Sequence, residues 1–223
     1  MPLFFMISGF LFKFRPIGET IRKGFRSLIV PYFILNAVCF MLEIIILHLQ
    51  GGDLSILAFI NRFMPIILGL GYKYNELIPV CTPMWFFYSL FIVQILASAS
   101  RQLYKYGHIL LFVISIVFAV ILKTYKFDTL VPIDSSLVAY PFFFGGYILK
   151  QITSTIDNSK VTKIVMVLLM VISLLMININ GRIDINTCNF GKSIILFYMI
   201  GGFISAALIC NLKYCKTMLG GQN

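Results

Sequence analysis

Long apolar runs separated by short polar loops extend along almost the whole chain. An α-helix rises about 1.5 Å per residue, so roughly 20 apolar residues are needed to cross a membrane. The first run is too short to cross completely and is expected to be a partial span. The pattern predicts about seven spans, at residues 1–12, 27–49, 83–100, 106–122, 137–150, 163–177 and 191–210.

The stretch from Leu54 to Leu70 is also apolar, but polar residues interrupt it. Asp53 stands just before it, and Asn61 and Arg62 lie inside it. We expect this amphipathic stretch to lie on the membrane surface rather than to cross.

Composition sets the fold class. Of the 223 residues, 60% are hydrophobic and only 12% are charged, and the mean hydropathy is +0.95. Soluble domains are about 45–50% apolar and about 25% charged. The expected fold is an all-α, polytopic membrane helical bundle that forms one membrane-embedded domain over residues 1–223. The lipid bilayer is therefore an expected partner.

The net charge of +10 follows from how the cations are distributed among the loops. If the loop of residues 13–26 is cytoplasmic and the spans alternate, the inner loops hold twelve Lys and Arg residues and the outer loops hold six. Cations accumulate in cytoplasmic loops, so the N-terminus is expected outside and the C-terminus inside. The positive charge needs no nucleic-acid partner.

Three cations precede the first full span. Arg22, Lys23 and Arg26 stand where a helix is expected to emerge into the cytoplasm. Arg22 and Arg26 are four residues apart and share a helical face, and guanidinium groups bind phosphate oxygens well. A phosphorylated donor such as a nucleotide-bearing acyl carrier would fit them. The alternative is that these cations only set the orientation of the span.

Glu43 is an ionisable residue inside an apolar run, about 25 Å along the helix from Arg26. Such residues inside a membrane are costly and often functional. Asn36, Glu43 and Gln50 recur every seven residues and share one face, which indicates a wet cavity or a polar seam. The alternative is a structural carboxyl group that a neighbouring helix satisfies.

Other reactive residues point to no particular chemistry. His48 lies about 140° around the helix from Glu43, so the two cannot form a dyad, and both His48 and His108 are expected at membrane interfaces. The five cysteines show no metal-binding spacing and no CxxC pair. A disulfide between Cys81 and Cys188 is left open. We find no GxSxG, HExxH, phosphate-binding or dinucleotide motif.

Five segments together resemble acyltransferase family 3, an integral-membrane family, and in particular its fucose 4-O-acetylase-like branch. MPLFFMISGFLF is similar to the family's second helix, and KGFRSLIVPYF resembles its basic element before a Leu-Ile-Pro-Tyr helix start. MWFFYSLFIVQIL resembles its Trp-Phe-Leu-Tyr helix. These segments and two further ones lie at residues 1–12, 23–33, 84–96, 140–150 and 180–198.

The resemblance implies an O-acyltransferase of the bacterial cytoplasmic membrane. It implies transfer of an acyl group, usually acetyl, from cytoplasmic acyl-CoA (acetyl-CoA) to a sugar hydroxyl of a cell-surface glycan or its lipid-linked precursor. Lys23 and Arg26 match the basic pair associated with the donor, and Arg22 adjoins them. Lys23 replaces the usual arginine, so one bidentate fork is lost. Trp85, Arg182, Asp184 and Asn186 are expected on the acceptor side.

The family's catalytic histidine would lie before residue 1, so no catalytic residue is assigned. Residues 221–223 resemble the start of a Gly-x-Asn-Ser element that further helices follow in the family. The chain therefore looks truncated at both ends and is expected to lack its general base. Two alternatives remain open: a transporter or flippase of a glycan or lipid-linked sugar, and an inactive remnant.

Overall fold

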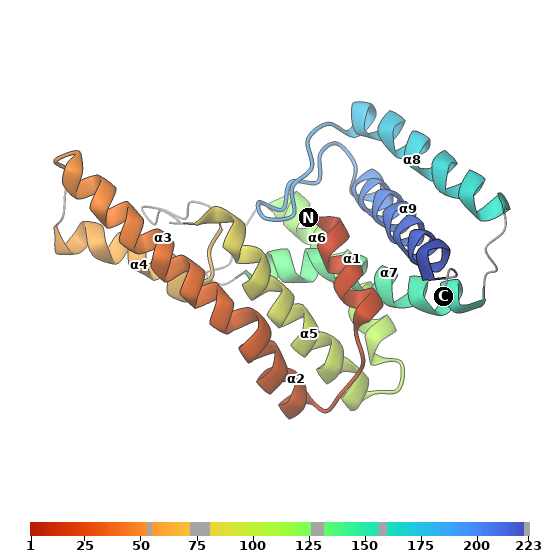
Figure 1. The fold of residues 1–223 in the computed structure, drawn as a ribbon, viewed down its shortest axis with the longest axis horizontal. Coiled ribbons are helices and arrows are strands. Elements are labelled where there is room, and N and C mark those ends of the chain that lie inside the picture. The colour runs from red at the N-terminus through yellow and green to blue at the C-terminus, as the bar shows by residue number, and fades with distance from the viewer. Residues whose placement is uncertain (53–54, 72–80, 126–131, 156–159, 221–223) are drawn as a thin grey trace. The chain divides into compact units, whose positions relative to one another are not determined.

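The computed structural model describes residues 1–52, 55–71, 81–125, 132–155 and 160–220, which leaves the C-terminal residues 221–223 outside the described part (Figure 1). The described residues form helices, and their one isolated β-bridge joins Asp184 and Asn189. The all-α prediction is confirmed. The helices are α1 (Pro2–Leu11), α2 (Ile17–Gly24), α3 (Val30–Leu49), α4 (Ile56–Leu68), α5 (Trp85–Leu103), α6 (Gly107–Tyr125), α7 (Ile133–Thr155), α8 (Lys160–Asn180) and α9 (Ile194–Gly220), with a π-helical turn η1 (Phe25–Ile29) and a 3₁₀ turn η2 (Thr82–Met84).

Four helical stretches in the described ranges are long and apolar enough to cross a membrane. They are Ile17–Leu49, Thr82–Leu103, Gly107–Tyr125 and Ile194–Asn211. Only 17–33% of each apolar window is buried inside the protein, so most of these side chains face outward, where lipid would solvate them. Shorter apolar helices cover Pro2–Leu11, Ile56–Leu68 and Val167–Asn180. The protein is a multi-pass membrane protein.

The chain divides into two compact units. The first unit comprises Met1–Lys13, Phe112–Thr124 and Val138–Asn223, and the second comprises Phe14–Leu111 and Tyr125–Leu137. Our expectation of one domain over the whole chain stays a prediction.

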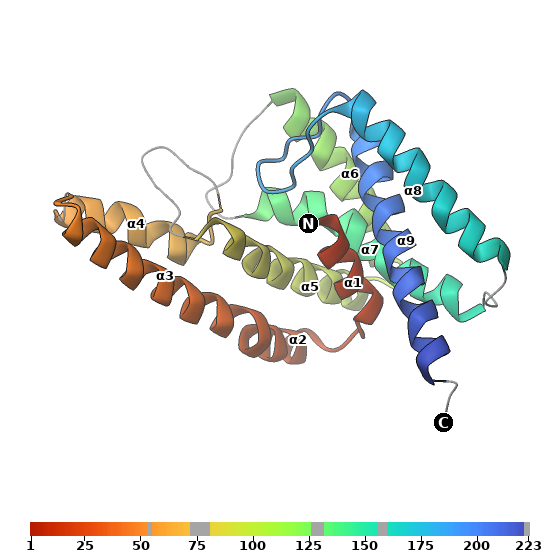
Figure 2. The ribbon, with the colours of Figure 1, turned by 45° about the horizontal axis from the view of Figure 1, so that its top comes forward.

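Glycines hold the first unit together by allowing helix backbones to approach closely. A Cβ atom built on Gly9 of α1 would lie 1.8 Å from the carbonyl oxygen of Phe143 in α7. One built on Gly146 of α7 would lie 1.9 Å from the carbonyl oxygen of Met6 in α1. On α9, Gly201 leaves room for a side chain instead, because its Cβ atom would lie 2.6 Å from the ring of Phe142. Helix α8 runs alongside α9 (Figures 1 and 2).

The second unit is organised by one long helix, Ile17–Leu49, which α2, η1 and α3 form without a break. Residues 17–24 were expected in a polar loop, but they fold as α2 because Thr20 and Gly24 pack against α5 while the charged positions stay exposed. The Thr20 and Ser98 hydroxyl groups lie 2.9 Å apart. The Tyr32 hydroxyl donates to the Ile66 carbonyl oxygen at 2.7 Å and ties α3 to α4.

The π-helical turn lies in the first half of this long helix, just before Pro31. Proline has no N–H, so Pro31 cannot donate the bond that a regular α-helix would direct to the Ser27 carbonyl. The wider turn also changes the spacing of buried positions: Thr20 and Gly24 are four residues apart, whereas Gly24 and Ile29 are five apart. The extra residue keeps Ile29 on the face that meets α5.

The two cysteines considered for a disulfide are not joined. Cys81 and Cys188 both remain thiols, and the Cys188 Sγ donates to the Ile185 carbonyl oxygen at 3.7 Å. Burial, assisted by the neighbouring Cys39 thiol, raises the pKa of Cys81 to about 11. The Cys81 thiol therefore stays protonated at neutral pH, which makes it a poor nucleophile.

Candidate functional site

Arg22, Lys23 and Arg26 lie around the junction of α2 and η1, and all three side chains are exposed. Gly24 between them is buried against the ring of Phe91 on α5. The cations therefore lie off the packed seam of the helix and face outward. Within the described part of the chain, none of the three forms an ion pair. They are available to an external anion.

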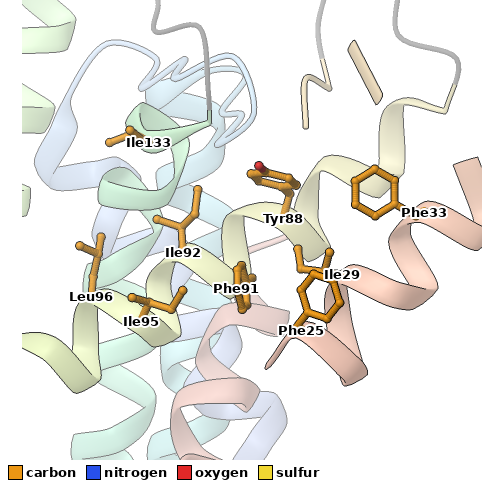
Figure 3. Close-up of a pocket in the computed structure, with 9 residues that line it drawn as sticks. All are labelled: Phe25, Ile29, Phe33, Tyr88, Phe91, Ile92, Ile95, Leu96 and Ile133. Carbon is orange, nitrogen blue, oxygen red and sulfur yellow. The ribbon is translucent and has the colours of Figure 1, made fainter. Parts of the chain in front are cut away.

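An apolar cavity of about 440 Å³ opens beside these cations, within the second unit (Figure 3). Phe25, Ile29 and Phe33 line it from η1 and α3. Tyr88 and four aromatic or aliphatic residues of α5 line the opposite side, and Ile133 at the start of α7 completes the lining. Cations and cavity are thus built on the same stretch of helix, because Phe25 lies between Lys23 and Arg26 in the sequence.

Glu43 forms an ion pair with Arg62 on the neighbouring helix α4. The Arg62 Nε donates to the Glu43 Oε1 at 3.0 Å, and the two side chains are 19% and 29% exposed. Arg62 Nη1 also donates to the Ala58 carbonyl oxygen at 3.2 Å. This contact agrees with the structural alternative for Glu43, in which a neighbouring helix pairs with the carboxyl group. It engages Oε1 alone, because Oε2 is buried without a hydrogen-bond partner among the described residues. Arg62, one of the polar residues inside the amphipathic stretch of residues 54–70, is that partner.

The other members of the polar stripe meet different surroundings. Asn36 is 2% exposed, and its Nδ2 donates to the Tyr32 carbonyl oxygen of its own helix at 2.9 Å. Gln50 is exposed at the end of α3. The three residues share a helical face but differ in exposure, and a wet cavity or polar seam common to them stays a prediction.

Three of the expected acceptor-side residues lie in the loop between α8 and α9, in the first unit. Arg182 is exposed, whereas Asn186 is 8% exposed. The Asp184 Oδ1 accepts a hydrogen bond from the Asn186 N–H at 3.0 Å, and the Asp184 and Asn189 backbones pair with each other. The Asp184 carboxylate therefore closes a turn, while Arg182 remains exposed to a ligand.

Trp85 begins α5 in the second unit and is 2% exposed. A Cβ atom on Gly71 would lie 2.4 Å from its indole ring, so the glycine leaves room for the tryptophan. Its position is that of a packed residue. A role for Trp85 in binding the acceptor stays a prediction.

Sequence reasoning missed a buried acid, and the expected place of the two histidines at membrane interfaces stays a prediction. His48 is exposed at the end of α3, and the His108 ring lies 6.2 Å from that of Phe14. Asp134, which stands between the expected spans 106–122 and 137–150, is 2% exposed in the first turn of α7. Its Oδ1 accepts from the Ser135 N–H at 2.7 Å. An acid just before an apolar run is typical of a helix start, and that signal could have revealed it.

Sequence reasoning also missed Asn180, the residue that holds the α8–α9 loop. Asn180 is 1% exposed, and its Nδ2 donates to the Phe190 carbonyl oxygen at 2.9 Å. Its Oδ1 accepts from the Ser193 N–H at 2.7 Å, and its backbone carbonyl accepts from the Lys192 N–H at 3.0 Å. An asparagine followed by glycine at the end of an apolar run was the available signal.

Replacing Asn180 by leucine is expected to destabilise the protein by about 2–4 kcal/mol, because the Phe190 carbonyl and the Ser193 N–H both lose a buried partner. Thermal unfolding of the detergent-solubilised protein measures the effect. Asn178→Leu, at an exposed position of the same helix, is the matched control. Equal melting temperatures for the two variants would contradict the role of Asn180 as a loop clamp.

Comparison with known proteins adds one finding. A family model described as "Acyltransferase domain" matches residues 1–219, which is nearly the whole chain. No curated protein and no solved structure matches the chain significantly.

Proposed function

The chain belongs to acyltransferase family 3, and from that premise we propose that it transfers an acyl group from cytoplasmic acyl-CoA to a sugar hydroxyl of a cell-surface glycan or its lipid-linked precursor. The protein is a multi-pass membrane acyltransferase. Acetyl is the group we propose as the usual cargo, and the fucose 4-O-acetylase-like branch is the proposed subgroup. The proposed setting is a bacterial cytoplasmic membrane, with the N-terminus outside and the C-terminus inside.

The observation that carries the donor proposal is the group of exposed cations Arg22, Lys23 and Arg26, none of which is ion-paired within the described residues. CoA carries several phosphate groups. Guanidinium groups bind phosphate oxygens in a bidentate manner, and an ammonium group binds them as a point charge. Placing these cations at the end of a long apolar helix would bring the donor to the membrane surface.

In the proposed reaction the sugar hydroxyl oxygen attacks the carbonyl carbon of the thioester. An ester bond forms, the carbon–sulfur bond breaks, and the CoA sulfur leaves as the thiol after taking up the proton that the hydroxyl loses. Arg182, Asp184, Asn186 and Trp85 remain the proposed acceptor-side residues. Arg182 is the one whose exposure suits direct contact with a sugar.

Replacing Lys23 and Arg26 together by alanine is expected to weaken CoA binding by at least tenfold. A hydrogen bond to a charged group contributes about 1.5–3 kcal/mol, and about 1.4 kcal/mol corresponds to a tenfold change in affinity. Titration of CoA and acetyl-CoA into the purified protein in nanodiscs measures the dissociation constants. Lys13→Ala, another exposed cation in the predicted cytoplasmic loop, is the control.

Two results would count against the proposal. If the unmodified protein binds neither CoA nor acetyl-CoA, the donor assignment fails. If a labelled glycan crosses liposomes containing the protein in the absence of acyl-CoA, a transporter is favoured over a transferase. Acetyl transfer to a glycan, with radiolabelled acetyl-CoA, tests the reaction itself.

A further inference from the structure

The apolar cavity of the second unit is too large and too hydrophobic for the acetyl group alone. Its volume of about 440 Å³ lies within the range of small-molecule binding sites, roughly 300–1,000 Å³. The lining is aromatic and aliphatic throughout, and the Tyr88 phenol supplies its one side-chain polar group (Figure 3). A polar ligand would lose hydrogen bonds to water in such a site, whereas a hydrocarbon would lose none.

The cavity is also elongated along the helix. Phe25 and Phe33 both line it and are eight residues apart, which corresponds to about 12 Å of helix. On the facing helix, Tyr88 and Leu96 are eight residues apart as well. An extended carbon chain advances less than one bond length of about 1.5 Å per carbon. The cavity therefore matches a chain of about eight carbons or more.

The cations beside the cavity indicate what carries this chain. Arg22 precedes Phe25 by about one helical turn, and Arg26 follows it directly, so charged side chains flank a residue of the cavity lining. A fatty acyl thioester of CoA combines phosphate groups and a hydrocarbon chain in one molecule. That combination is complementary to the exposed cations and the apolar cavity together.

The backbone conformation around the cavity also favours a binding site. The π-helical turn η1 contributes Phe25 and Ile29 to the lining, and π turns inside α-helices occur frequently at functional sites. A Cβ atom on Gly24 would lie 2.7 Å from the Phe91 ring, which itself lines the cavity. The glycine therefore allows α2 to approach α5 and leaves the Phe91 ring in its place at the wall.

We propose that this cavity binds the acyl chain of the donor thioester, so that the enzyme accepts acyl groups of about eight carbons in addition to acetyl. This inference rests on the proposed use of acyl-CoA, and it adds the length of acyl group that the same site takes. Each methylene that leaves water contributes about 0.8 kcal/mol, or about fourfold in affinity. Octanoyl has six more methylenes than acetyl, and burial of only about three of them gives about 60-fold, so octanoyl-CoA is expected to bind at least about 30-fold more tightly than acetyl-CoA.

The test compares CoA, acetyl-CoA and octanoyl-CoA binding to the protein in phosphatidylcholine nanodiscs, with empty nanodiscs to subtract partitioning into lipid. Ile95→Trp should fill the cavity and bring the ratio of the acetyl-CoA and octanoyl-CoA dissociation constants close to one. Ile92→Ala should enlarge the cavity and shift the preference toward decanoyl-CoA. Leu103→Trp, at an exposed position of α5 outside the lining, is the control and should keep the original preference.

The outcomes distinguish failure of this inference from failure of the proposed function. Equal affinity for acetyl-CoA and octanoyl-CoA overturns the inference and leaves acyl-CoA as the donor. Competition by free octanoic acid or by added phosphatidylglycerol as strong as that by octanoyl-CoA overturns it as well, because the cavity would then hold membrane lipid. Failure of all three CoA compounds to bind overturns both.

Discussion

Gly146→Ala is expected to destabilise the protein by about 3 kcal/mol or more, whereas Gly145→Ala at the adjacent position is expected to be neutral or stabilising. A Cβ atom on Gly146 would lie 1.9 Å from the carbonyl oxygen of Met6 and 2.8 Å from its carbonyl carbon. These are backbone atoms of α1, so no side-chain rotation can relieve the overlap. Overpacking of this kind usually costs about 1–3 kcal/mol and sometimes more.

Gly145 provides the internal control because its Cβ atom would meet only the flexible end of the Met6 side chain, at 3.7 Å. Alanine is also favoured over glycine inside a helix by about 1 kcal/mol. Thermal unfolding and size-exclusion profiles of the two variants in detergent measure the difference. Gly201→Ala and Gly202→Ala form a second pair on α9, with the Phe142 ring at 2.6 Å from the first Cβ and open space around the second.

Equal stability of Gly145→Ala and Gly146→Ala would show that α1 and α7 do not pack through this contact. The reciprocal variant, Gly9→Ala, provides an independent test because its Cβ atom would lie 1.8 Å from the Phe143 carbonyl oxygen. Gly9→Ala should match Gly146→Ala in effect. Combining the two should cost less than the sum of both, because either one already separates the same two helices.

Removing one partner of the Glu43–Arg62 pair is expected to destabilise the protein by about 1–3 kcal/mol. Arg62→Leu leaves the Glu43 carboxylate without its 3.0 Å partner in an apolar segment, where an uncompensated charge is costly. Glu43→Leu leaves the Arg62 guanidinium in the same position. The partial exposure of both side chains, 19% and 29%, keeps the effect below that of a fully buried pair.

The double variant Glu43→Leu/Arg62→Leu is expected to recover most of that stability, since an apolar pair of similar size often replaces a buried ion pair without loss. A double-mutant cycle on the free energy of unfolding in detergent gives the coupling between the two side chains. Additive effects of the single substitutions would mean that the ion pair contributes nothing. A double variant that is stable but has lost acyl transfer would support a functional role for Glu43.

The fold class and most helices could be predicted from the sequence because lipid imposes a simple requirement on it. Each segment that crosses must be apolar for about 20 residues and must satisfy its backbone hydrogen bonds internally, as a helix does. Runs such as residues 27–49 and 106–122 meet that requirement locally, and the structure places α3 and α6 there. The family could also be recognised from the sequence, because its motifs are short and local in the chain, and the family match over residues 1–219 confirmed it.

The candidate site was harder to predict because its parts meet across distant segments. Arg22, Lys23 and Arg26 stood out as a dense group of cations, but nothing in their pattern indicated the cavity that α5 forms beside them. Glu43 was noticed as an acid in an apolar run, yet its partner Arg62 lies 19 residues away on another helix. Asp134 and Asn180 stand between expected spans, where polar residues are usually solvated, yet both are almost completely buried.

The junction of α2 and η1, with its three cations around Phe25, shows most clearly which features followed from the sequence and which depended on the tertiary structure. Hydrophobic runs and charge bias are properties of neighbouring residues, so the chain alone specified a multi-pass helical protein with cations at the mouth of a long helix. The π-helical turn, the contact of Gly24 with Phe91 and the cavity between α3 and α5 depend on which helices pack together. Helix packing is set by contacts between residues far apart in sequence, and these contacts convert a cluster of charges into a candidate site for an acyl donor.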